Sequence, residues 1–454
     1  MTAAEATPPA DTPAPRDIFG HPPGLWYLAF TEAWERFSYY GMQALLALYL
    51  TKYLFAPERI AGVIGFDFVR AFFGGIEGQP LASAIVGGYF ALVYLTPIAG
   101  GFIADRWLGR RLTVLLGAVI MALGHFLMAI EALLFFALAA LVIGVGLFKG
   151  NIASQVGALY KPADLRRADA FQIFYLGINA GVIAAPLIVG TLGEKVGWHW
   201  GFGAAGVGML IGLAIYLAGQ KYLPPETPRA TAHNPKTALS GNDWSALVAL
   251  LLLIPVMAIA IVPNNQIFNA YLVWGDAQFD LRWGDTVLPT TWLVTLDAIV
   301  SVGFLAGVAL FWRWAGPRFG EPDELGKMII GSAFSVGGML CLFMAAATQG
   351  EGEKIGLFWP VAFHVVNSIG FAHLLPVSLA LFARLAPASI NATVIGLYYL
   401  AFFAGNTIVG WVGGWLTTMP VTQFWLIHAV FAGVAGVVFL GLKLALRQRL
   451  LAPS

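Results

Sequence analysis

Long runs of apolar residues, each about 20 residues in length, recur along almost the whole 454-residue chain. A run of this length forms a helix that crosses about 30 Å of hydrocarbon, so each run is a candidate membrane span. Only 11% of the residues are charged, against roughly 25% in a soluble domain. The sequence therefore predicts an all-α membrane protein that lies in the lipid bilayer.

The apolar runs form two sets of six, separated by a polar segment. We place the spans at residues 25–54, 82–104, 112–130, 133–159, 171–193, 198–222, 245–275, 287–314, 326–347, 355–384, 391–418 and 422–446. Two bundles of equal size are typical of transporters that hold a substrate at the bilayer midplane between the halves. The predicted units are a tail (1–24), an N-terminal bundle (25–222), a linker (223–244), a C-terminal bundle (245–446) and a tail (447–454).

Lys and Arg residues are distributed unevenly between alternate loops. With both termini in the cytoplasm, the cytoplasmic segments carry about three times as many of these residues as the outer loops. Residues 1–20 are rich in Ala, Pro and Thr and lack the apolar stretch of a signal peptide, so the first span must direct insertion. We therefore expect a multi-pass protein of the cell inner (cytoplasmic) membrane with cytoplasmic termini.

Several functional classes lack support in the sequence. The formal net charge is +1, which gives no basis for a nucleic-acid partner. The sequence contains no nucleotide-binding Gly-Lys loop, no HExxH and no nucleophile elbow, so we expect neither an enzyme nor a cofactor. His125, His364 and His373 have no metal-ligand spacing, and we interpret them as packing residues without a metal. We expect the protein to function as a monomer.

One face of the first span is polar. A charged side chain at the centre of a spanning helix costs about 2.5–3.5 kcal/mol, so this face must point into the protein. At about 100° per residue, its members share an arc of roughly 140°. They are Glu32, Glu35, Arg36, Tyr39 and Tyr40.

The charges on this face need partners. Glu32 and Arg36 are four residues apart and can pair within the helix, whereas Glu35 lies at the other edge of the arc. We predict that Lys149, which lies in the fourth span, is its cation. One alternative is that the cluster only fixes helix packing, but buried pairs are often no better for stability than apolar residues. The cluster would also store protons well, because a proton on one carboxylate releases a cation.

Two further polar residues lie in otherwise apolar spans. Asn179 in the fifth span could contact a ligand or join two helices by a hydrogen bond, and the sequence does not decide between these roles. Asp297 in the eighth span has no partner in its own helix, and we predict that it faces a cavity.

The loop between the second and third spans carries a recognisable motif. Residues 101–111 read GFIADRWLGRR, which resembles the loop motif G-x-x-x-D-R-x-x-G-R-R of the major facilitator superfamily. The resemblance implies the major facilitator fold. It also implies that Asp105, Arg106, Gly109 and Arg110 form a gate at the cytoplasmic helix ends, where charged side chains interact with the helix dipoles.

A second resemblance is more specific. Residues 32–40 read EAWERFSYY and residues 174–181 read FYLGINAG, which resemble the E-x-x-E-R-F-x-Y-Y and F-Y-x-x-I-N-x-G motifs of the proton-dependent oligopeptide transporter (POT) family. Lys149 and Tyr94 lie where this family has a lysine and a tyrosine. The resemblance implies import of di- and tripeptides with protons. It assigns proton coupling to Glu32, Glu35 and Lys149, and peptide binding to Arg36, Tyr39, Tyr40, Tyr94 and Asn179.

The C-terminal half departs from the family pattern. The family's tenth-helix glutamate, five residues before a proline, falls at Phe371, and its eleventh-helix tryptophan falls at Tyr398. The seventh span has neutral residues at 264–265, and the eighth has Asp297 in place of asparagine. We include Phe371 and Tyr398 in the expected substrate site. We further hypothesise that Asp297 holds the peptide's amino group.

These departures leave alternatives open. The substrate could be a modified amino acid or an organic anion carried with protons. A membrane sensor that binds peptides without moving them is a third reading, although neither end of the chain resembles a signalling domain. The leading expectation is proton-coupled import of short peptides by alternating access.

Overall fold

The computed structural model describes residues 17–161, 164–226, 241–387 and 391–450, and these residues are mostly helical. Most of the predicted N-terminal tail, most of the linker and the last four residues lie outside the described residues. The last helix reaches Leu450, so the described part of the predicted C-terminal tail is helical.

The N-terminal half contains six long helices. They are α1 (Pro23–Tyr49), α4 (Gly78–Ile103), α5 (Arg110–Leu127), α6 (Leu134–Ala158), α7 (Arg166–Ala185) and α8 (Trp198–Gly219). Short π-helical turns extend α1 to Leu54 and α7 to Val196. The loop after α1 contains two helices that the sequence did not predict, α2 (Pro57–Ile60) and α3 (Phe66–Phe72).

The C-terminal half has a similar plan. Its helices are α9 (Gly241–Asn265), α10 (Ala270–Gln278), α11 (Trp292–Phe319), α12 (Glu324–Ala347), α13 (Phe358–Leu385), α14 (Asn391–Gly413) and α15 (Val421–Leu450). The predicted seventh span is broken into α9 and α10, because Asn269 adopts a non-helical backbone (φ −133°, ψ −105°). A small hairpin, β1 (Arg282–Trp283) and β2 (Thr286–Val287), delays the start of α11 to residue 292.

Within the described residues, eleven helical segments are long and apolar enough to cross a membrane. The remaining long helix, α1, has 27 residues and carries the charged side chains of Glu32, Glu35 and Arg36. Its length is sufficient to span a bilayer, since a residue rises 1.5 Å along a helix. The structure therefore matches the prediction of about twelve spans.

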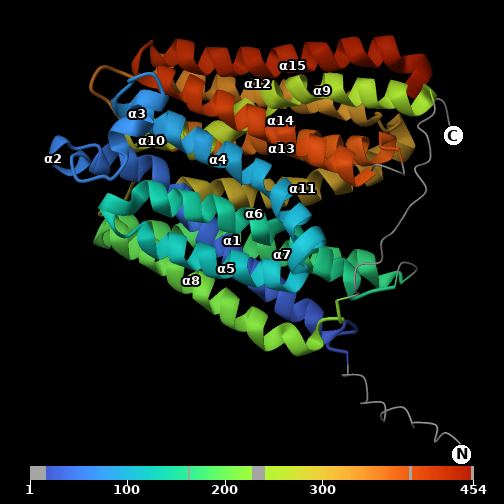
Figure 1. The fold of residues 1–454 in the computed structure, drawn as a ribbon. Coiled ribbons are helices and arrows are strands. Elements are labelled where there is room, and N and C mark those ends of the chain that lie inside the picture. Colours follow the sequence, from blue (N-terminus) through green and yellow to red (C-terminus); the bar gives the residue numbers. More distant parts are fainter. Residues whose placement is uncertain (1–16, 162–163, 227–240, 388–390, 451–454) are drawn as a thin grey trace, which may run out of the picture.

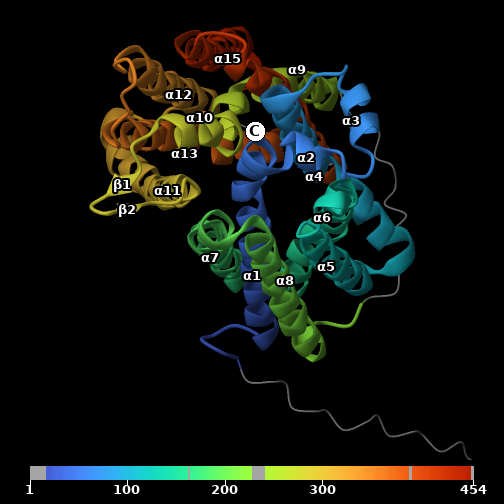
Figure 2. The same ribbon diagram turned by 90° about the vertical axis from the view of Figure 1, so that its left-hand side faces the viewer.

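The helices gather into two bundles (Figure 1). Helices α1 and α5–α8 lie together, as do α9 and α11–α15, and Figure 2 shows the same separation from the end of the molecule. Helix α4 packs both on α6 and on α14 of the other bundle. Gly87 and Gly410 meet there backbone to backbone, and a Cβ on either residue would touch or overlap the other helix.

Apolar side chains form separate cores in the two halves. One core uses residues of the N-terminal half. Two others lie mainly in the C-terminal half, one near α10 and the ends of α14 and α15, the other around α9, α13 and the opposite end of α15. Buried polar side chains, including Gln266, His364, Asn367 and His428, occur in the C-terminal half as well. Such groups require hydrogen-bond partners, and Gln266 and His428 contact each other at 3.1 Å.

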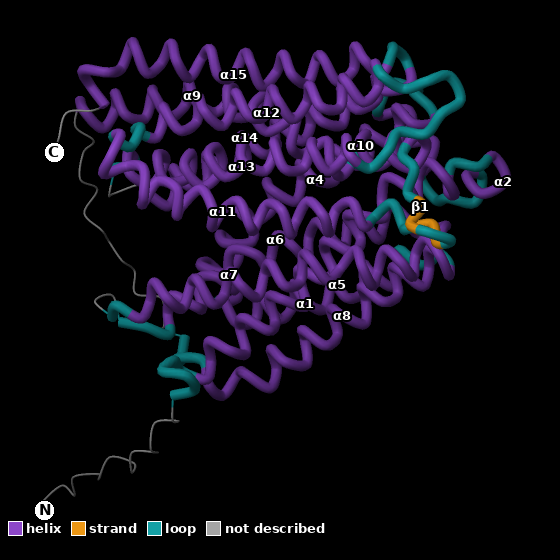
Figure 3. Tube along the Cα trace, turned by 180° about the vertical axis from the view of Figure 1, so that it is seen from behind, coloured by secondary structure: helices purple, strands orange, loops and turns teal. Residues whose placement is uncertain are grey.

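The bundles are joined at one end of the molecule. Lys52 pairs with Asp276 at 2.8 Å across the interface. Glu194 accepts hydrogen bonds from the backbone N–H groups of Thr290 and Thr291 (2.9 and 2.8 Å), so its carboxylate caps α11 of the opposite bundle. Toward the other end, where α1 begins and α15 ends, the bundles diverge (Figures 1 and 3).

A candidate substrate cavity between the bundles

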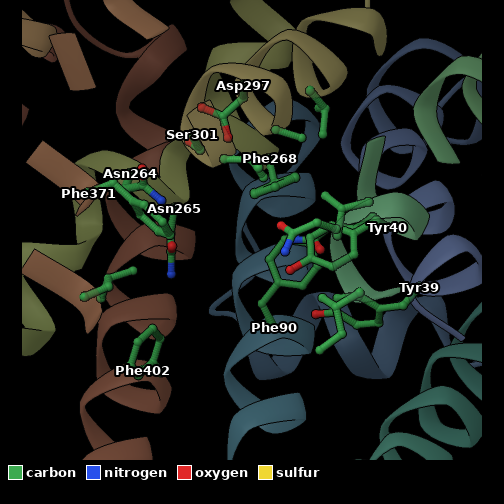
Figure 4. A pocket seen from close by; sticks show the side chains of 18 of the residues that line it. Tyr39, Tyr40, Phe90, Asn264, Asn265, Phe268, Asp297, Ser301, Phe371 and Phe402 are labelled. Atoms are coloured by element: carbon green, nitrogen blue, oxygen red, sulfur yellow. The ribbon is translucent and has the colours of Figure 1, made fainter. Parts of the chain in front are cut away.

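A cavity of about 250 Å³ lies between the two bundles. Its polar and charged lining comes from α1, α4, α6, α7, α9, α11 and α14. These residues are Tyr39, Tyr40, Gln43, Tyr94, Lys149, Tyr175, Asn179, Asn264, Asn265, Asp297, Ser301 and Asn406. Figure 4 shows Tyr39 and Tyr40 on one side of the cavity and Asp297, Ser301, Asn264 and Asn265 on the other. The cavity is thus mixed in character, with aromatic walls and several polar groups.

The charged cluster of α1 lies just behind this lining. Arg36 Nε is 2.8 Å from Glu32 Oε1 and 2.8 Å from Glu35 Oε2, and all three side chains are buried. Only the contact with Glu32 has the geometry of a hydrogen bond. Both oxygens of Glu35 lack a hydrogen-bond partner among the described residues. Glu35 is therefore a buried carboxylate that is held by charge alone.

The predicted pair of Glu35 with Lys149 is absent from the ion pairs of the described residues. Arg36 instead pairs with the carboxylates of both Glu32 and Glu35. Lys149 instead places Nζ 4.7 Å from the centroid of the Tyr94 ring, which is cation–π geometry. No carboxylate among the described residues lies within 4 Å of it. Lys149, and not Arg36, is the cation that lines the cavity.

In the C-terminal bundle, Asp297 contacts a buried histidine. Oδ1 of Asp297 is 3.0 Å from Nδ1 of His364 in α13. The other ring nitrogen, Nε2, is 2.9 Å from the hydroxyl of Tyr271 in α10. The sequence had suggested a packing role for His364, and its burial agrees with this, but the contact with Asp297 was not anticipated. Asp297 does line the cavity, as predicted.

Most of the other predicted substrate residues lie at the cavity. Tyr39, Tyr40, Tyr94, Asn179 and Phe371 line the cavity. Asn179 also donates to the carbonyl of Tyr175 in its own helix at 2.8 Å.

Tyr398 and Arg36 are not among the lining residues in this conformation. The Tyr398 side chain is buried in the C-terminal bundle, with its hydroxyl 3.0 Å from Ser378. Phe402, one helical turn further on, lines the cavity in its place.

Comparisons with known proteins agree with this geometry. The sequence pattern of the POT family matches residues 111–238. The chain is 32% identical to the "Uncharacterized transporter YclF" of Bacillus subtilis (strain 168), over 92% of this chain and 94% of that protein. It is 30% identical to the "Peptide transporter YePEPT" of Yersinia enterocolitica, over 89% of this chain and 90% of that protein. The chain belongs to the POT family.

A solved structure supports the same assignment. The crystal structure of a peptide transporter POT in complex with sulfate superimposes with a TM-score of 0.82 at 28% identity, over 96% of both chains. This POT family member is therefore a multi-pass membrane transporter with the major facilitator fold, as the sequence predicted.

Several polar contacts around the cavity were not predicted from the sequence. Asn367 Nδ2 donates to Asn264 Oδ1 at 2.8 Å, and Asn265 Nδ2 donates to Asn406 Oδ1 at 3.1 Å. These bonds hold α9 against α13 and α14. For His364 a signal existed: it precedes Phe371 by seven residues, so both side chains lie on one face of α13.

The loop motif of this POT family member lies between α4 and α5. Arg110 is 3.7 Å from Asp105, and both side chains are largely exposed. Gly109 has φ +77°, a conformation that a residue with a Cβ rarely adopts. Arg106 stacks over Phe102 at 6.0 Å. Asp105, Arg106 and Arg110 thus make contacts within the motif, whereas Arg111 donates to the carbonyls of Leu223 and Pro224 after α8. The role of the motif in gating remains a prediction.

Proposed function

We propose that this protein is a proton-coupled symporter that imports di- and tripeptides by alternating access across the cell inner membrane. The observation that carries the proposal is the distribution of charge in the cavity. Lys149 lines the cavity from α6 of the N-terminal bundle, and Asp297 lines it from α11 of the C-terminal bundle. A zwitterionic peptide has a carboxylate and an ammonium group at its two ends, and each would find a charge of opposite sign.

The cluster behind Tyr39 and Tyr40 supports proton coupling. Glu35 is fully buried and has no hydrogen-bond donor among the described residues. Its one close charge contact is with Arg36 at 2.8 Å, so a proton that binds to Glu35 would replace this ion pair. Protonation would weaken the hold of Glu35 on Arg36. The freed guanidinium, like Lys149, could then interact with the substrate carboxylate.

The direction of opening identifies one state of the proposed alternating-access cycle. The bundles are joined at the end that carries Lys52 and Glu194, and they diverge toward the end where α1 begins. With cytoplasmic termini, as the Lys and Arg distribution predicts, this conformation faces the cytoplasm. It corresponds to the state that releases substrate, and a second conformation must open the joined end.

The direct test is uptake of labelled dialanine into proteoliposomes, with and without an inward proton gradient. We expect accumulation above the external concentration only when the gradient is present. A proton ionophore should reduce the internal peptide to the external concentration. Accumulation that ignores the gradient would contradict proton coupling, and failure to transport any peptide would favour the non-peptide substrate.

The carboxyl end of the substrate gives a second test. An amidated dipeptide should bind about 10- to 100-fold more weakly than the free acid, the scale of one lost charge-assisted hydrogen bond. Competition against labelled dialanine measures the difference. A Lys149→Gln variant should lose most of this discrimination, because Lys149 is the lining cation. Equal competition by both forms in the wild type would argue against a peptide carboxylate in the cavity.

The amino end gives a matched test on the other wall. An Asp297→Asn change should weaken dialanine binding by about 1.5–3 kcal/mol, the scale of a hydrogen bond to a charged group. The same change should barely affect N-acetyl-dialanine, which has no ammonium group. Competition binding of both ligands to both proteins measures this. Equal weakening of the two ligands would show that Asp297 does not contact the amino end.

Phe371 favours one alternative substrate class. It contributes an apolar side chain to the cavity, and Asn264 and Asn265 are neutral, so Asp297 is the only carboxylate in the described lining. An organic anion, or an amino acid modified so that its amino group carries no charge, would need no anionic contact. The comparison of N-acetylated and free dipeptides also tests this alternative, since an anion carrier would prefer the acetylated form.

A further inference from the structure

Asp297 lines the cavity and contacts His364, which is not among the lining residues. The Asp297 side chain is 14% exposed, whereas the His364 side chain is fully buried. The carboxylate is 3.0 Å from Nδ1 of the imidazole, and the hydroxyl of Tyr271 is 2.9 Å from Nε2. Among the described residues, Asp297 is thus the cavity-lining group that contacts the His364 ring by a hydrogen bond.

These hydrogen bonds suit two protonation states of the ring. In the neutral ring, Nδ1–H donates to Asp297 and Nε2 accepts from the Tyr271 hydroxyl. In the protonated ring, Nδ1–H still donates to Asp297, and Nε2–H donates to the same hydroxyl oxygen once the hydroxyl hydrogen has rotated away. Both states keep both nitrogens bonded. Histidine is also the side chain that ordinarily changes charge between pH 5 and 8.

The other charged and titratable groups around the Asp297–His364 pair come from α1, α6 and α7. From α1, Tyr40 faces Asp297 across the cavity, with Arg36 and the carboxylates of Glu32 and Glu35 behind it. Lys149 of α6 and Tyr175 of α7 line the same cavity. Among the described residues, His364 is the only group that forms an ion pair with Asp297.

We propose that Asp297 and His364 together form a proton-binding site in the C-terminal bundle, at which a proton and the ammonium group of the substrate compete. This inference rests on the proposed function and names the regulation of its amino-end contact. With a neutral imidazole the pair carries one negative charge, which attracts an ammonium group. With a protonated imidazole the pair is neutral, and Asp297 is engaged by its own imidazolium.

His364 is thus a positioning residue that decides whether Asp297 is available. The consequence is a pH-dependent choice of substrate. As the pH falls, ligands with an ammonium group lose affinity relative to ligands without one. Protonation at Glu32 and Glu35 affects the carboxylate end, which both kinds of ligand share, so its effect cancels in the ratio of the two affinities.

The experiment measures the affinity of dialanine relative to that of N-acetyl-dialanine, by competition binding to the full-length purified transporter between pH 5.5 and 7. The upper limit keeps the peptide amino group protonated, because such groups titrate near pH 7.7–8.0. In the wild type we expect the ratio to rise by about 5- to 30-fold over this range, since one competing proton changes affinity by at most tenfold per pH unit.

Variants assign the effect to His364. In His364→Gln the ratio should stay constant across the pH range. The matched control is His428→Gln: His428 is also fully buried and hydrogen-bonded, to Gln266 and to the Phe424 carbonyl, but it does not line the cavity or contact Asp297. This control should keep the wild-type rise.

A further variant guards against misfolding of His364→Gln. In Tyr271→Phe the rise should persist but be centred at a lower pH, because the imidazolium loses the oxygen that accepts from Nε2–H. A structural role for Tyr271 alone would not move the midpoint in this direction.

The outcomes separate this inference from the proposed function. Binding of both ligands with a ratio that does not change with pH would overturn the inference and leave the proposed function intact. An unchanged rise in His364→Gln would also overturn it. Absence of binding by either ligand would overturn both.

Discussion

A Lys149→Ala variant is expected to lose gradient-driven accumulation of dialanine completely, while exchange of internal for external peptide continues at a reduced rate. Lys149 is the one cation of the described cavity lining, and no carboxylate among the described residues pairs with it. A free ammonium group at this position responds to the charge of the neighbouring Glu32, Glu35 and Arg36. Without it, protonation of the cluster has no lining cation on which to act, so we expect it no longer to be coupled to peptide binding.

The two assays, concentrative uptake and counterflow, distinguish this loss from a simple failure to bind. Counterflow needs no net proton movement, so it reports binding and conformational exchange alone. Lys149→Arg retains the charge and serves as the matched control, with partial uptake expected. Full concentrative uptake by Lys149→Ala would show that the lysine has no part in coupling.

Removing the other cation should affect the fold itself. In an Arg36→Gln variant, Glu32 and Glu35 would remain buried without the group that now lies 2.8 Å from both. Breaking a buried ion pair by removing one partner costs about 3–5 kcal/mol. We therefore expect a large fall in the thermal unfolding temperature of the purified protein in detergent.

A double variant tests this explanation. Glu35→Gln combined with Arg36→Gln removes one charge of each sign, so it should recover a substantial part of the lost stability. The recovery would appear as coupling in a double-mutant cycle. Additive losses in the cycle, or an Arg36→Gln variant as stable as the wild type, would mean that water reaches the cluster and satisfies the carboxylates.

The elements that could be predicted from the sequence are those that depend on local patterns. Apolar run length located the spans, and the polar face of α1 indicated the charged cluster. At the break in the seventh span, Asn269 is buried and donates to the Val409 carbonyl of α14, a contact for which a window of sequence gives no signal. The short helices α2 and α3, of four and seven residues, bury no side chain and are too short for a search based on apolar runs of about 20 residues. Element boundaries are the least reliable part of any such prediction.

The sequence indicated which residues belong to the candidate site better than it indicated which of them contact one another. Adjacent residues on a helix point about 100° apart, so Glu35 and Arg36 are not expected to face each other. The long Arg36 side chain nevertheless brings its Nε to both carboxylates and leaves Lys149 without one. The contact between Asp297 and His364 joins residues 67 positions apart, and it depends on how α11 packs against α13.

If the proposed proton-coupled symport holds, the charges around the cavity also determine where the membrane potential would act in the cycle. With His364 neutral, the carboxylates of Glu32, Glu35 and Asp297 outnumber the cations Arg36 and Lys149 by one. A zwitterionic dipeptide adds no net charge, and one transported proton cancels the excess. The loaded bundles then rearrange as a neutral body, whereas the empty ones return with one negative charge. A potential that is negative inside therefore drives the return of the empty carrier to the outside, by up to about 2.3 kcal/mol for each 100 mV. Voltage would accelerate the resetting of the transporter and leave the inward movement of the peptide almost unaffected.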